Sequence, residues 1–108
     1  LSVDDETTLA RIEKTHKDTG EIIDPHSAVG LEAAHQIRSS GLVSPEIPII
    51  SLACAHPAKF PDAVYRATGF YPDLPAQLDD FLEKKEYTVE LPNDFDSVSN
   101  YIADNTNV

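Results

Sequence analysis

The sequence has no methionine or tryptophan, only one cysteine, and eight basic side chains among its 108 residues. One cysteine cannot form an internal disulfide, which fits a reducing compartment, and we expect a cytoplasmic protein. No apolar run approaches the roughly 20 residues that a membrane-spanning helix needs, so we expect no membrane partner. The chain opens on Leu1 without a charged leader or an apolar targeting run, which suggests a piece of a longer protein.

Nineteen acidic side chains outnumber the eight basic ones and give a formal net charge of -11. This charge disfavours nucleic acid and anionic membranes as partners. The acids are spread along the chain, so they also fit ordinary solvation of helix faces. A chain of this length buries one modest core, and we expect residues 1–108 to be a single unit that is too short for a complete two-domain enzyme.

Capping residues and the spacing of apolar residues predict a mainly helical chain. The predicted helices run from Asp4 or Asp5 to Gly20, over 25–39, over 61–67, over 75–85, and from 93–96 to near the end. Glycines follow the first and third of these, where a left-handed residue commonly ends a helix.

A short apolar run rich in β-branched residues predicts a buried central strand over 49–53, because Pro48 cannot donate to a strand ladder. This strand would deliver Cys54 and His56 to a loop at its carboxyl end, where ligands bind in open α/β sheets. The alternative is a core strand in which Cys54 is a small buried hydrophobe and His56 a turn residue. Alternation over 87–91 predicts a short edge strand or an extended segment. The expected fold class is therefore α/β: mainly helical, with one buried central strand and short edge strands.

Several residues have side chains that bind metals: Asp24, His26, His35, Cys54 and His56. Their spacing does not support a metal site, since His26 and His35 fall on different helix faces and no Cys-x-x-Cys or His-x-x-x-His pair occurs. Cys54 and His56 also lack an identifiable third member for a nucleophilic triad. We expect neither a metal site nor a catalytic residue in this chain.

Two stretches carry a more specific signal: Asp24-Pro25-His26-Ser27-Ala28-Val29-Gly30 and Ala55-His56-Pro57-Ala58-Lys59-Phe60. Together, in this order and approximate spacing, they resemble the C-terminal part of the threonine synthase family, and the resemblance runs from Val3 through the last predicted helix. It implies the C-terminal part of a fold-type-II enzyme that uses pyridoxal phosphate. The implied reaction converts O-phospho-L-homoserine and water into L-threonine and phosphate.

The resemblance also implies roles for individual residues. In the family a hydroxyl residue just before the second stretch sits against the pyridine nitrogen of the cofactor; here that position is Cys54, and a thiol makes a poorer hydrogen bond than the usual Thr. Beside it, His56 either lines the site or holds the loop through its ring nitrogens. Lys59 is not the cofactor-bearing lysine, which lies earlier in the family's sequence, and is expected to be solvated or to tether the loop. Asp24 is expected to cap a helix, with His26 in its first turn near the interface with missing sequence.

The chain has no glycine-rich loop for the cofactor phosphate and no candidate for the cofactor-bearing lysine. We therefore expect the isolated chain to be inactive and to form one wall of a site completed by the N-terminal remainder of the same enzyme. The alternative is a stand-alone acidic interaction or small-molecule-binding domain derived from this family.

Overall fold

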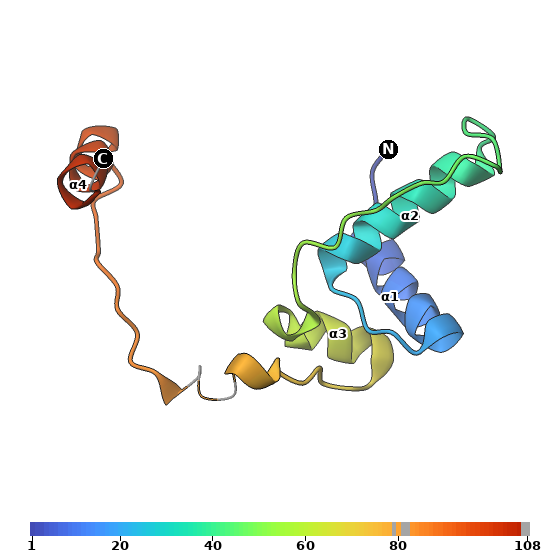
Figure 1. The fold of residues 1–108 in the computed structure, drawn as a ribbon, viewed down its shortest axis with the longest axis horizontal. Coiled ribbons are helices and arrows are strands. Elements are labelled where there is room, and N and C mark those ends of the chain that lie inside the picture. The colour runs from blue at the N-terminus through green and yellow to red at the C-terminus, as the bar shows by residue number, and fades with distance from the viewer. Residues whose placement is uncertain (79, 81–82, 107–108) are drawn as a thin grey trace. The chain divides into compact units, whose positions relative to one another are not determined.

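The computed structural model describes residues 1–78, 80 and 83–106, which cluster into two compact units, Leu1–Ala76 and Gln77–Val108 (Figure 1). The first unit contains the helices α1 (Asp5–Thr19), α2 (Pro25–Ser39) and α3 (Pro61–Thr68), with the 3-10 turn η1 (Pro57–Lys59) just before α3. The second contains α4 (Phe95–Asn105), and the 3-10 turn η2 (Ala76–Leu78) begins at the last residue of the first unit. That residues 1–108 act as a single unit stays a prediction.

The α-helices begin and end at the residues that local chemistry favours. Three of them are capped by an aspartate that accepts a backbone N–H bond: Asp4 from Thr7 at 2.8 Å, Asp24 from His26 at 2.9 Å, and Asp94 from Ser97 at 2.9 Å. Such caps satisfy amide donors that have no partner within the helix. Gly20 and Gly69 end α1 and α3 in the left-handed conformation, both with φ of 79°. The helices predicted near both ends of the chain, over 25–39 and over 61–67 are thereby confirmed.

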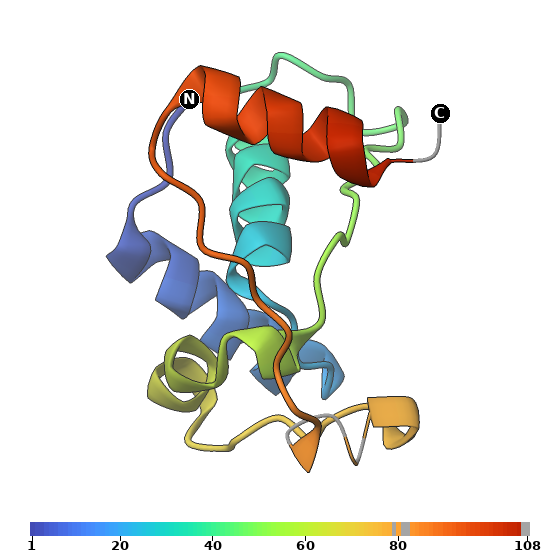
Figure 2. The same cartoon turned by 90° about the vertical axis from the view of Figure 1, so that its left-hand side faces the viewer.

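The core of the first unit forms where its three α-helices meet. Ile12 of α1, Ala28 of α2 and Val64 of α3 are completely buried. Figure 2 shows these helices gathered around one centre, with α1 lying against both α2 and α3. Because each helix contributes one fully buried apolar residue, the core of this unit is built by helix-to-helix packing.

A partly buried ion pair joins α1 to α2. The Arg11 Nε and Nη2 atoms donate to one Glu32 carboxylate oxygen at 2.8 and 2.5 Å, while Gln36 Nε2 donates to the other at 3.0 Å. These hydrogen bonds from Arg11 and Gln36 lower the pKa of Glu32 below its usual range. The carboxylate therefore stays ionised and paired at neutral pH.

The predicted central strand over 49–53 is wrong, and with it the α/β fold class. Among the described residues the structure has helices but no strand, and 49–53 is irregular. Ile50 and Leu52 are 83 % and 78 % exposed, so this segment is not buried. It follows the side of α2 in both Figure 1 and Figure 2. A β-branched run forms a strand only against a ladder partner, and here Arg38 of α2 instead donates to the Ile47 carbonyl, at 2.6 Å.

Two further predictions fail in the second part of the chain. The alternating segment 87–91 has no strand, so the predicted edge strand is wrong there as well. Of the helix predicted over 75–85, the described residues include η2 but no α-helical residue, and positions 79, 81 and 82 lie outside the described residues. Lys84 Nζ forms an ion pair with the Asp80 carboxylate four residues earlier, at 3.1 Å.

Gly30 allows the segment after Ile47 to lie close to α2. A Cβ atom at position 30 would overlap the Ser51 hydroxyl oxygen and lie 3.7 Å from the Ser51 Cβ. The close neighbour of α2 at this point is therefore an irregular segment, neither a strand nor another helix.

Replacing Gly30 with alanine tests that approach. The substitution gains helix propensity, worth about 1 kcal/mol, but forces Ser51 to move, so the single variant should change the free energy of unfolding by less than about 0.5 kcal/mol. In a Ser51→Gly background the same change should stabilise the chain by about 1 kcal/mol, because the overlap is gone. Urea unfolding of the four proteins gives the coupling. Additive effects within error would show that Ser51 does not approach α2.

Candidate functional site

The two stretches that carry the resemblance lie against each other in the first unit. The rings of His26, at the start of α2, and Phe60, just before α3, have centroids 4.9 Å apart and planes inclined by 56°. Aromatic rings in this arrangement attract each other beyond the area they bury. The contact holds the segment 55–60 at the beginning of α2, so residues far apart in sequence form one surface region.

Asp24 organises the α2 side of this region. Its carboxylate is 1 % exposed and accepts bonds from the His26 backbone N–H at 2.9 Å, from His26 Nδ1 at 3.0 Å, and from the Ser27 hydroxyl. Burial alone would raise the pKa of Asp24, but the bonds from Ser27 and His26 outweigh it, and the pKa is lowered. The predicted helix cap is confirmed. The same carboxylate fixes the orientation of the His26 ring by accepting its Nδ1–H.

His56 holds the loop on the other side. Its Nδ1 accepts the Ala58 backbone N–H at 3.2 Å and thereby caps η1. In a neutral ring the proton must then be on Nε2, because each nitrogen is either donor or acceptor. The side chain is exposed. His56 therefore stabilises the loop through one nitrogen and presents an N–H donor on the other.

Cys54 lies on the same loop, two residues before His56. Its thiol is exposed, and its described contact is a weak one, from Sγ to the Leu52 carbonyl oxygen at 3.9 Å. The alternative of a small buried core thiol is therefore wrong. An exposed, weakly bonded thiol keeps its capacity to accept or donate one hydrogen bond to another group.

Lys59 contributes a cation next to this loop. Its Nζ lies 5.8 Å from the centroid of the Phe60 ring, within the range of a cation–π contact. The residue is exposed. This geometry agrees with a loop-tethering lysine, because the ring it contacts is the one that packs on His26.

Of the metal-ligand types singled out in the sequence, Asp24 and His26 contact each other, at 3.0 Å from Oδ1 to Nδ1. Within residues 1–78, 80 and 83–106, no three His, Cys, Asp or Glu side chains are placed to hold a metal ion. Among the same residues, no helix is both long enough and apolar enough to cross a membrane.

Two contributors to the site were not identified from the sequence. Phe60 positions the loop against His26, and Ser51 lies directly against Gly30 of α2. The signal for Phe60 was present, since it ends the second stretch, but its ring contact depends on tertiary packing. Nothing in the sequence pattern marks Ser51.

A small helical body with a structured loop and an exposed apolar segment is typical of a domain that completes another polypeptide's surface. The family model "Threonine synthase, C-terminal" matches residues 27–102, and the chain belongs to this family. Curated threonine synthases from Pseudomonas aeruginosa and Corynebacterium glutamicum are 39 % and 36 % identical over 99 % and 89 % of the chain. A solved structure of pyridoxal-phosphate-bound threonine synthase from Brucella melitensis is 40 % identical, covers 96 % of the chain and has a TM-score of 0.71.

The chain spans only part of these proteins. It covers 22 % of the Pseudomonas aeruginosa enzyme, 19 % of the Corynebacterium glutamicum enzyme and 21 % of the Brucella melitensis chain. The match to the family model and these identities confirm the resemblance that the two stretches indicated.

Proposed function

We propose that this chain is the C-terminal portion of a cytoplasmic threonine synthase, which converts O-phospho-L-homoserine and water into L-threonine and phosphate with pyridoxal phosphate. Its immediate partner is the N-terminal remainder of the same enzyme. The chain by itself is inactive, since its sequence offers neither a cofactor-bearing lysine nor a glycine-rich phosphate loop.

The observation that carries this proposal is the similarity of 96 % of the chain to a structure with bound pyridoxal phosphate, at 40 % identity. The exposed apolar segment supports it independently. Ile47, Ile50 and Leu52 are 54 %, 83 % and 78 % exposed within six residues of the chain, and exposed apolar segments mark sites of association. This feature favours a part of a larger enzyme over a stand-alone domain.

The residues of the loop fit one end of the cofactor. Pyridoxal phosphate, when bound, supplies an electron sink for carbanion chemistry. Cys54 offers a neutral thiol that can hydrogen-bond a ring nitrogen without favouring its protonation, as a carboxylate would. His56 offers an Nε2–H donor on a loop that its Nδ1 already holds. The loop thus contributes contacts to the ring end, and the phosphate and the lysine belong to the partner sequence.

The chain's own residues act mainly by positioning. Asp24 orients His26, the His26 ring packs on Phe60, and this contact places the loop that carries His56 and Cys54. Because reacting groups must be held within fractions of an ångström, loss of this support should lower activity without direct contact with substrate.

A chimeric enzyme tests the proposal. The C-terminal part of the Pseudomonas aeruginosa threonine synthase that aligns with this chain is replaced by residues 1–108, and phosphate release from O-phospho-L-homoserine is measured. We expect the chimera to be active and the enzyme truncated before this region to be inactive, because the truncation removes one wall of the site.

The 108-residue chain alone serves as a control and should release no phosphate. A chimera that folds and binds the native enzyme's cofactor but has no more activity than the truncated enzyme would contradict the proposal. Turnover by the isolated chain would contradict the assignment of the remaining site to the N-terminal part.

A further inference from the structure

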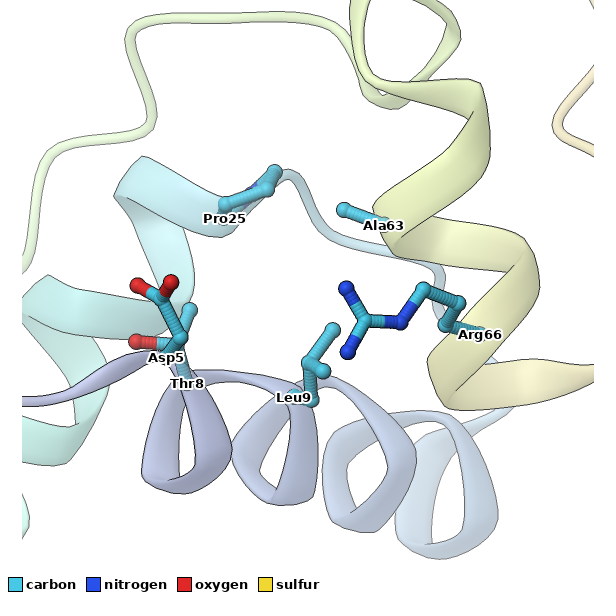
Figure 3. A pocket seen from close by; sticks show the side chains of 6 residues that line it. All are labelled: Asp5, Thr8, Leu9, Pro25, Ala63 and Arg66. Carbon is cyan, nitrogen blue, oxygen red and sulfur yellow. The ribbon is translucent and has the colours of Figure 1, made fainter.

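A pocket of about 180 Å³ lies between α1, the start of α2 and α3, and none of residues 54–60 lines it. Six side chains line it: Asp5, Thr8, Leu9, Pro25, Ala63 and Arg66. Figure 3 shows the Arg66 guanidinium reaching into the space from α3, with Asp5 on the far side, at the start of α1. Three helices therefore contribute to one concave surface with a charge of each sign.

Both charged residues are exposed, and Asp5 stands in the first turn of α1, where a carboxylate is favoured by the positive end of the helix dipole. Among the described residues, the Asp5 and Arg66 side chains form no hydrogen bond and no ion pair, whereas other charged side chains of the same unit are paired, such as Arg11 with Glu32. The Thr8 hydroxyl donates to the Asp4 carbonyl oxygen at 2.7 Å and is therefore occupied. The groups of the pocket that remain able to bind a polar ligand are therefore one carboxylate and one guanidinium.

We infer that this pocket binds a small zwitterionic α-amino acid. The Arg66 guanidinium can accept a carboxylate in its planar two-pronged geometry, and the Asp5 carboxylate can pair with the ammonium group. Leu9, Pro25 and Ala63 supply an apolar wall for a short side chain. No element of the Cys54 loop is involved, so the inference does not depend on the proposed function.

Size and charge limit the ligand class. The hollow of about 180 Å³ is smaller than the pockets of about 300–1,000 Å³ that hold drug-sized molecules, so it matches a small ligand. A simple anion such as phosphate would pair with Arg66 but meet the Asp5 carboxylate, and an amine would face the reverse conflict. An amino acid satisfies both groups at once.

Titration of the isotopically labelled 108-residue chain with L-alanine tests the inference by nuclear magnetic resonance. We expect saturable shifts of the Leu9 and Ala63 methyl signals. L-alaninamide, which lacks the carboxylate, and acetate, which lacks the ammonium group, should bind at least about tenfold more weakly, since each loses one charge-assisted contact. These comparisons use the unaltered protein and do not depend on any variant folding.

Two variants assign the contacts. Arg66→Gln and Asp5→Asn should each weaken L-alanine binding by about tenfold, while Lys85→Gln, on the second unit and outside the pocket, should leave it unchanged. Shifts that are equal for L-alanine and acetate would overturn the inference in favour of simple anion binding. Absence of saturable shifts, or binding that survives both pocket variants, would overturn it outright.

Discussion

Replacing Asp24 with alanine is expected to lower the free energy of unfolding of the chain by about 3 kcal/mol. The substitution removes the cap of α2 and leaves the buried Ser27 hydroxyl without its acceptor, at a position where the carboxylate is 1 % exposed; the exposed His26 ring also loses its Nδ1–H bond. Urea unfolding followed by far-ultraviolet circular dichroism measures the effect. Asp4→Ala, which removes an exposed cap of α1, is the matched control and should cost less. Equal losses would show that burial of Asp24 adds nothing to its role as a cap.

The same residue gives stability a defined dependence on pH. The folded pKa of Asp24 is lowered from its ordinary value of 3.8, so its contribution is fully present above that value and is lost as the pH falls through the folded pKa. Glu32, lowered from 4.5 by Arg11 and Gln36, acts in the same direction. Stability should therefore decline below about pH 4.5, and the decline should be shallower in Asp24→Asn. An unchanged slope in that variant would mean that its carboxylate is not preferentially ionised in the folded state.

Replacing Cys54 with leucine in the chimeric enzyme is expected to lower kcat/KM for O-phospho-L-homoserine on the order of 100-fold. A branched apolar side chain removes the hydrogen-bonding group and displaces whatever lies against the thiol. Phosphate release under steady-state conditions measures the change.

Two control variants separate the site from the segment that carries it. Cys54→Thr restores the residue usual in the family and should keep or raise activity. Ile50→Leu, an apolar change of similar volume on the same exposed segment, should have little effect. Wild-type kinetics for Cys54→Leu would remove this residue from the site.

Helix boundaries were the part of the fold that sequence could predict, because they depend on local chemistry. Asp4, Asp24 and Asp94 each accept a backbone N–H just inside a helix, and Gly20 and Gly69 each adopt a left-handed conformation just after one. These interactions involve residues at most a few positions apart, so the sequence contains all that determines them.

The strand over 49–53 could not be decided in the same way. Its β-branched residues fit a strand, but a strand also requires a neighbour, and whether one is present is a property of the tertiary structure. In this chain the Arg38 guanidinium binds the Ile47 carbonyl and Gly30 allows Ser51 to lie close to α2, so the segment follows a helix.

The candidate site was predictable only in its parts. The two stretches marked Asp24, His26 and His56 as important, and the roles of Asp24 as a cap and of His56 in holding its loop follow from short-range contacts. The ring contact between His26 and Phe60 was not predictable, because it joins elements far apart in sequence. The same reason explains why the pocket between Asp5 and Arg66 gave no signal in the sequence.

The distance between the Cys54 sulfur and the cofactor ring in a crystal structure of the chimeric enzyme with pyridoxal phosphate tests the central claim most directly. If the loop of this chain completes the cofactor site, the sulfur should lie within about 4 Å of the pyridine nitrogen, with His56 on the same side of the site. A sulfur that remains in solvent, with the ring nitrogen bound by a residue of the N-terminal part, would contradict the account.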